Sequence, residues 1–266
     1  MTAPLITLLS DFGLKDPYVA EMKAVILTIC QNARIIDISH MIEEFNVRMG
    51  AFVLASATPY FPEGAIHVAV VDPGVGTKRR ALLVQTNRAF YIGPDNGVLM
   101  LAAKKNQIRH VFTLSNPEFM LPRMSATFHG RDVFAPAAAY LANGVNPNKF
   151  GPETKDYEVP SFAHPELRAK GLAGEVLHID NFGNVITNVS IDDLKKTGTK
   201  AGERLVIDHK NQSHSANLFT AYGNAEPGSL LALIGSHGFL EIAVNQGNAS
   251  RKLRMKTGDA LIIRAV

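Results

Sequence analysis

Stretches rich in polar residues and glycine follow several apolar runs of this sequence, and they hold the side chains best suited to chemistry. A carboxylate or an imidazole can accept a proton from a bound water, and an arginine can stabilise the hydroxide-like form of that water. The stretches are SDFG (10–13), DPGVGTKRR (72–80), GPDNG (93–97), FHGRD (128–132), DNFGN (180–184) and GSHG (235–238). Taken singly, most of them also suit ordinary turns, and Asp132 is a candidate helix cap.

Several well-known catalytic motifs are absent from the sequence. It contains no G-x-x-x-x-G-K-[ST] phosphate loop, no G-x-S-x-G turn of a serine hydrolase and no complete G-x-G-x-x-G fingerprint of a dinucleotide site. It also lacks the H-E-x-x-H and C-x-x-C pairs that are typical of zinc sites. We expect no metal and no cofactor. A magnesium or manganese site at Asp11, Asp72, Asp95 and His129, as in a metal-dependent phosphoesterase, is an alternative that loss of activity with a chelator would reveal.

The first 150 residues alternate between predicted strands and predicted helices. Val19, Met22, Ile26 and Ile29 are spaced for one face of a helix, and Asn46 is a candidate cap for the next helix. Further helices are expected at 97–105 and 132–142, and strands at 5–9, 34–40, 65–72 and 108–114, with a hairpin at 81–86 and 89–93. This alternation predicts an α/β sandwich with a mostly parallel central sheet.

Three candidate side chains follow the ends of predicted strands in this half. They are Asp11, His40 and Asp72. Ligands of open α/β sheets bind beyond the carboxyl ends of the strands. We therefore expect the chemistry at this edge of the sheet.

The second half of the chain has a different pattern. Prolines at 152, 160 and 165 mark residues 151–170 as a linker. Short, roughly alternating runs then follow with turns between them and without a helical period, at 174–180, 184–190, 203–209, 229–235, 239–244 and 260–266. The prediction is an N-terminal α/β domain at 1–165 with the catalytic residues, and a smaller C-terminal β-barrel at 166–266.

Composition excludes several classes of protein. The chain has 266 residues, 46% of them hydrophobic, which is incompatible with disorder of the whole chain. Its 27 Lys and Arg against 24 Asp and Glu leave a net charge of only +3, so no nucleic-acid partner is expected. The single Cys30 lies in an apolar stretch and suits the core. No segment has the length of a membrane span, and the N-terminus lacks the basic region of a signal peptide, so we expect no membrane contact and a cytoplasmic location.

Taken together and in order, the motifs carry more information than any one of them. SDFG, VVDPGVGTKRR, GPDNG, TFHGRDVFAPAAA, DNFGNVITN and SHGFLEIAVN follow one another along the chain. In this respect the sequence closely resembles the SAM hydroxide adenosyltransferases, which are adenosine-forming hydrolases of S-adenosyl-L-methionine (SAM). The resemblance extends from Ile6 to Val266. It implies an α/β domain followed by a small β-barrel, and a homotrimer whose active sites form between neighbouring subunits.

The resemblance also implies a reaction and its catalytic residues. Water or hydroxide attacks the 5′-carbon of SAM and displaces L-methionine, which leaves adenosine. The family's Asp, Arg and His around the attacking water match Asp72, Arg79 and His129. Because Arg80 adjoins Arg79, the assignment of the arginine could shift by one residue.

Substrate contacts are implied in the same way. Asp11 matches the residue that accepts hydrogen bonds from the ribose hydroxyls, and Asp16 and Asp180 match positions near the ammonium of the methionine end. Phe182 and Asn184 match the adenine contacts. Ser236 and His237 match the pair that meets the methionine carboxylate. The related halogenating enzymes have an arginine where this chain has His237, and their adenine loop is one residue longer.

Two other functions are compatible with a pocket of this kind. A 5′-halogenase would need an uncharged residue in place of Asp72, because a carboxylate repels fluoride and chloride. A non-catalytic sensor of SAM or adenosine would have no need of Asp72, Arg79 and His129 together. The sequence therefore favours hydrolysis with water as the nucleophile.

Overall fold

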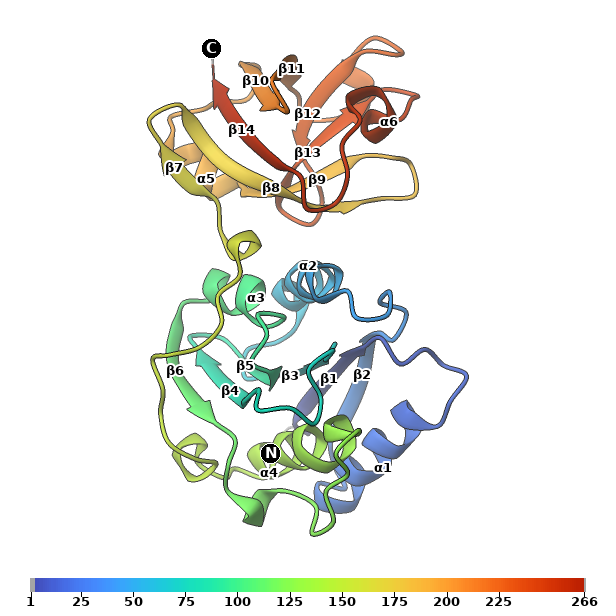
Figure 1. The fold of residues 1–266 in the computed structure, drawn as a ribbon, viewed down its shortest axis with the longest axis vertical. Coiled ribbons are helices and arrows are strands. Elements are labelled where there is room, and N and C mark those ends of the chain that lie inside the picture. The colour runs from blue at the N-terminus through green and yellow to red at the C-terminus, as the bar shows by residue number, and fades with distance from the viewer. Residues whose placement is uncertain (1–2, 266) are drawn as a thin grey trace. The chain divides into compact units, whose positions relative to one another are not determined.

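The computed structural model describes residues 3–265, which form two compact units with the boundary between Pro160 and Ser161. Each unit has its own hydrophobic core. The predicted architecture, an α/β sandwich followed by a β-barrel, is confirmed (Figure 1). Met1, Thr2 and Val266, which fall within the predicted domains, lie outside the described residues.

The N-terminal unit is built on a mixed sheet with the strand order β2-β1-β3-β5-β4-β6. The pairs β1–β2, β1–β3 and β3–β5 are parallel, whereas β4 runs antiparallel to both of its neighbours. The strands are β1 (Leu5–Ser10), β2 (Arg34–Ser39), β3 (Ile66–Val70), β4 (Ala81–Thr86), β5 (Phe90–Pro94) and β6 (Ile108–Thr113). The predicted hairpin is thus the β4–β5 pair, and it introduces the one reversed strand.

Helices cover both faces of this sheet (Figure 1). On one face lie α1 (Tyr18–Ile29) and α4 (Ala135–Ala142), and on the other lie α2 (Val47–Ala57) and α3 (Met100–Lys105). Helix α1 buries Val19, Met22 and Ile26, as their spacing predicts. Helix α2 begins after Asn46, whose side chain accepts the backbone N–H of Met49 and so satisfies one of the open donors of the first turn.

The barrel unit closes on itself. Strands β8, β9, β13, β12, β11, β10 and β14 follow one another by pairing, and β14 pairs back with β8. Short β7 (Glu166–Arg168) extends β8 outside the ring. The strands of the ring are β8 (Gly171–Ile179), β9 (Val185–Ser190), β10 (Arg204–His209), β11 (Gln212–Leu218), β12 (Leu230–Ile234), β13 (Phe239–Val244) and β14 (Ala260–Ala265).

The structure differs from the sequence predictions at several elements of this half. The barrel unit contains two short helices, α5 (Ile191–Lys196) and α6 (Ala249–Leu253). They are too short to show a period, but each begins at a good cap, Ser190 and Asn248. The predicted linker is in part regular structure, because it contains β7. Strand β11 was not predicted, since its alternation runs through small polar residues.

Short helical turns complete both units. One-turn 3₁₀ helices lie at Thr58–Tyr60, Pro117–Phe119, Pro147–Lys149, Ser161–Ala163 and Tyr222–Asn224. A π-helical turn, Gly130–Phe134, leads into α4. Among residues 3–265, no helix is long and apolar enough to cross a membrane.

Candidate active site

Asp72, Arg79 and His129 form one connected group, which we call the arginine cluster. The Arg79 Nε lies 3.0 and 2.9 Å from the two carboxylate oxygens of Asp72, and its Nη2 donates to the same carboxylate. The same Nη2 lies 2.8 Å from Nδ1 of His129. The side chains of Arg79 and Asp72 are only 10% and 5% exposed, so the ion pair is largely shielded from water.

The neighbouring Arg80 points to a different carboxylate. Its Nε donates to Asp95 at 2.9 Å, and its Nη1 reaches the exposed Asp156 at 3.3 Å. Asp95 also accepts the backbone N–H of Glu158 at 2.8 Å, so it anchors the end of this unit. The two adjacent arginines are therefore distinguished by their partners, and Arg79 is the one beside Asp72 and His129.

The hydrogen bond between Arg79 and His129 fixes the state of the imidazole. A guanidinium has only donors, so Nδ1 of His129 must accept and cannot carry a proton. The imidazole is then neutral, with its proton on Nε2. Burial and the positive charge of Arg79 lower the pKa of His129, against the opposing effect of Asp72 and Asp132. Geometry and electrostatics thus agree on a neutral His129.

The loop after β3 is closely fitted to the loop that carries His129. Thr77 donates from its hydroxyl to the Gly74 carbonyl at 2.7 Å and accepts the backbone N–H of Arg79 at 3.3 Å. Gly76 has a φ of 75°, and a Cβ there would lie 2.4 Å from the carbonyl oxygen of Ala126. Only glycine permits this approach. The DPGVG sequence therefore brings Arg79 against the loop before His129.

The prediction that Asp132 caps a helix is wrong. Asp132 is fully buried within the π-helical turn, and His129 stands at the position before that turn. Its carboxylate accepts the backbone N–H of Ser125 at 2.6 Å and Nε of Arg131 at 2.7 Å. Arg131 also reaches Glu21 of α1 at 2.8 Å. The buried charge is thus compensated by hydrogen bonds that tie the His129 loop to α1.

Asp11 lies where the sequence predicts it, directly after β1. Its carboxylate accepts the backbone N–H of Phe45 at 2.9 Å. Burial raises its pKa, and the negative charge of Asp72 adds to this effect. The segment is anchored by His40, which follows β2 and lies 2.7 Å from the Ser10 hydroxyl through Nδ1. Asp16, five residues on, is exposed in the loop before α1.

In the barrel unit, Asp180 organises the loop that contains Phe182 and Asn184. One oxygen of Asp180 accepts the backbone N–H groups of Phe182 and Asn184, each at 2.9 Å, and the other accepts the Asn184 amide at 2.9 Å. Asn184 is buried, while Phe182 is 78% exposed with its ring available for stacking. In this structure Asp180 shapes its own loop with both carboxylate oxygens.

Ser236 and His237 lie in the turn between β12 and β13, and His237 contacts a residue that was not predicted from the sequence. That residue is Glu241, which is 3% exposed in the middle of β13. Its Oε2 lies 3.3 Å from Nε2 of His237, and its Oε1 accepts the Tyr222 hydroxyl at 2.5 Å. We call Glu241, His237 and Tyr222 the glutamate cluster.

The predicted residues are therefore distributed over both units of the described structure. The arginine cluster and Asp11 lie at the carboxyl edge of the sheet in the N-terminal unit, while Asp16 lies on an exposed loop of that unit. The Asp180 loop and the Ser236–His237 turn belong to the barrel unit, and the charge of Asp180 contributes to raising the pKa of Tyr222. Among residues 3–265, no three or more His, Cys, Asp or Glu side chains are grouped so as to hold a metal ion.

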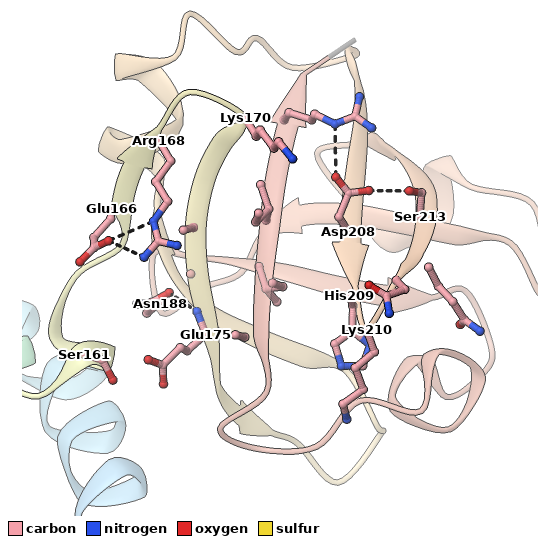
Figure 2. A pocket seen from close by; sticks show the side chains of 18 of the residues that line it. Ser161, Glu166, Arg168, Lys170, Glu175, Asn188, Asp208, His209, Lys210 and Ser213 are labelled. Carbon is pink, nitrogen blue, oxygen red and sulfur yellow. Dashed lines mark hydrogen bonds and ion pairs between the residues drawn. The ribbon is translucent and has the colours of Figure 1, made fainter.

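A separate cavity of about 880 Å³ lies on the barrel surface beside β7, β8, β10 and β14 (Figure 2). Two of its charged side chains have local partners, since Arg168 donates to Glu166 and Asp208 accepts from the Ser213 hydroxyl. None of the predicted site residues lines it. It is thus distinct from the groups described above.

Comparison with known proteins gives a consistent result over the whole chain. The family models of the SAM hydroxide adenosyltransferase N-terminal and C-terminal domains match residues 6–151 and 174–262. A curated relative from Thermus thermophilus, named (R)-S-adenosyl-L-methionine hydrolase, is 41% identical, with 94% of this chain and 95% of the relative covered. A relative of the same name from Salinispora arenicola is 38% identical, with 99% of each chain covered.

A solved structure also matches nearly the whole chain. An uncharacterised conserved protein from Thermotoga maritima matches with a TM-score of 0.84 and 39% identity, covering 97% of this chain and all of that one. Fluorinases match at lower identity, as the enzyme from Nocardia brasiliensis does at 29% over 98% of this chain and 97% of its own. With both domains matched in order and hydrolase relatives above 35% identity over nearly the full length, this chain belongs to the SAM hydroxide adenosyltransferase family.

Proposed function

We propose that this chain is an S-adenosyl-L-methionine hydrolase that forms adenosine and L-methionine. The curated relatives above 35% identity carry the hydrolase name, and the fluorinases are more distant. The observation that carries the proposal in the molecule itself is the arginine cluster, which joins a carboxylate, a guanidinium and a neutral imidazole. These are the groups needed to bind and deprotonate a water molecule.

In this reaction the protein's main task is to activate the nucleophile. The oxygen of water attacks the 5′-carbon, the carbon–sulfur bond breaks, and its electron pair stays on the sulfur of methionine. A sulfonium leaves without protonation, so no general acid is required. Attack by a hydroxide-like oxygen on a cation neutralises charge, and a dry site favours such a transition state.

The hydrogen bonds within the cluster suggest a division of roles. Arg79 stabilises the developing hydroxide by its fixed positive charge. Because Nδ1 of His129 accepts from Arg79, its Nε2–H is a donor, so His129 orients the water rather than taking its proton. Asp72 is the anion of the cluster and accepts the proton.

The remaining predicted residues are assigned to binding the substrate. Asp11 accepts from the ribose hydroxyls, since an ionised carboxylate offers acceptors only. Asp16 and Asp180 attract the ammonium of the methionine end. Phe182 stacks on adenine and Asn184 hydrogen-bonds to it, and the Ser236–His237 turn meets the carboxylate.

We also propose that the enzyme acts as a cytoplasmic homotrimer with active sites completed between subunits. This proposal comes from the sequence resemblance, with substrate groups expected from both units of the chain. Sedimentation of the purified protein at the mass of a monomer, with full activity, would contradict it.

The test of the function is the products formed from SAM. Purified protein is incubated with SAM, with and without chloride and a chelator, and the nucleosides are separated by chromatography. We expect adenosine to appear in step with methionine in every sample. His129→Ala should lower kcat by about 10²-fold, because the water loses its orientation, with little change in the affinity for SAM. SAM that binds but is never cleaved would indicate a sensor, and a 5′-halogenated nucleoside would indicate a halogenase.

A further inference from the structure

Glu241 is a buried carboxylate on the outer face of the barrel strand β13, where a polar residue would ordinarily be solvent-exposed. Every residue of β13 is buried, and Leu240, Ile242 and Val244 on one face belong to the barrel core. Glu241 lies on the opposite face and is 3% exposed. Removing a carboxylate from water is costly unless hydrogen bonds compensate for the loss. Hydrogen bonds from Tyr222 and His237 provide this compensation.

Those partners fix the state of His237. The backbone N–H of Phe239 donates to Nδ1 of His237 at 3.2 Å, so Nδ1 is an acceptor. Nε2 then carries the proton and points to Oε2 of Glu241 at 3.3 Å. Both ring nitrogens are thus directed to β13. The ring therefore holds the turn through partners within the protein.

The turn is shaped around this ring. The backbone N–H of Gly235 donates to the Phe239 carbonyl at 3.0 Å, and that of Gly238 donates to the Gly235 carbonyl at 2.8 Å. A Cβ at Gly235 would lie 2.4 Å from Nε2 of His237 and 2.8 Å from Oε2 of Glu241. The glycine therefore leaves the space in which imidazole and carboxylate meet. Ser236 is exposed at the tip of the same turn.

We propose that Glu241 is a positioning residue for the amino-acid end of the substrate. Acting through His237, it holds the 235–238 turn in the one shape that presents Ser236 to the α-carboxylate of SAM. This inference rests on the proposed function. It replaces direct contact by the His237 ring with an indirect role, in which the ring holds the turn.

The experiment combines the variant Glu241→Gln with a shortened substrate. The amide of glutamine has one acceptor oxygen in place of two, so it cannot accept from both the Tyr222 hydroxyl and the Nε2–H of His237, and its hold on the turn is weakened. Adenosine release is measured from SAM and from its decarboxylated form, which lacks the α-carboxylate. We expect kcat/KM for SAM to fall about tenfold, mainly through KM, while the value for decarboxylated SAM changes less than about twofold.

Two further variants make the result decisive. Glu166→Gln changes an exposed carboxylate of the same unit and should alter neither substrate's kinetics. His237→Phe keeps a ring but removes both nitrogens, and it should reproduce the selective loss if Glu241→Gln does not fold. An equal fall for both substrates, or no fall, would overturn the proposal. Failure of the wild type to release adenosine from SAM would instead refute the proposed function.

Discussion

The arginine cluster and the glutamate cluster each contain a buried carboxylate and a histidine, but the groups that donate hydrogen bonds to the carboxylate differ. In the first, the carboxylate faces a permanent cation, and that cation also donates to the histidine. In the second, the carboxylate accepts from the hydroxyl of Tyr222 and the N–H of His237. The first carboxylate is thus held by a cation, whereas the second is held by a hydroxyl and an imidazole N–H.

This difference shows that the role of each histidine follows from the nitrogen its neighbours leave available. Among the partners that residues 3–265 provide, His129 is held through Nδ1 alone, so its Nε2–H can serve the reaction. His237 is held through both nitrogens, so it can only support the backbone around it. A histidine in a sequence motif therefore does not reveal by its presence alone whether it acts on the substrate or on the fold.

The largest expected effect is that of removing the cation from the arginine cluster. Arg79→Met leaves Asp72 buried without its charge partner and removes the donor to His129. We expect kcat to fall by about 10²–10³-fold, the usual loss when an electrostatic group at a reaction centre is deleted. Adenosine release under saturating SAM measures it.

Arg80→Met is the matched control, because its partners Asp95 and Asp156 lie outside the cluster. It should change kcat by less than about threefold, as expected for a group that makes no contact with the reacting atoms. A greater loss with Arg80→Met than with Arg79→Met would show that the two arginines have been assigned in the wrong order.

These two arginines also mark how far the sequence alone could lead. The motif places an arginine near Asp72, but two adjacent guanidiniums have the same chemistry. Their separation depends on the Gly74–Thr77 turn and on the start of β4, which direct one side chain to each carboxylate. By contrast, the Asn46 cap and the face of α1 follow from local spacing, and both were predicted correctly.

A smaller effect is expected from pH, and it tests the contact between His129 and Arg79. Burial and then Arg79 lower the pKa of His129 below its usual 6.5. Protonation would place a hydrogen on Nδ1 opposite the Arg79 donor and break their contact. As the pH falls, kcat should therefore hold steady through 6.5 and then decrease about tenfold per pH unit below the lowered pKa. A decrease in kcat centred at 6.5 or above would show that His129 is not held next to the Arg79 cation.

Glu241 shows why part of the site escaped the sequence. In the run FLEIAV it looks like the outward polar residue of an alternating strand. The outer face of β13 at this point is covered by the short turn Tyr222–Asn224, which comes from elsewhere in the chain. Burial of a polar residue by a distant segment leaves no periodic signal.

The smallest expected effect is that of Tyr222→Phe, which tests whether the glutamate cluster acts through His237. Burial, followed by the hydrogen bond and charge of Glu241, raises the pKa of Tyr222, so the phenol remains a donor throughout the working range of pH. Losing it should reduce the free energy of unfolding by about 1–2 kcal/mol, because one carboxylate oxygen loses its partner. The turn stays anchored by His237, so KM for SAM should rise only about two- to threefold with kcat unchanged. Denaturant unfolding and steady-state kinetics measure the two effects, with Tyr60→Phe at an exposed position as control. A rise in KM as large as that of Glu241→Gln would mean that Glu241 acts through Tyr222 and not through the histidine.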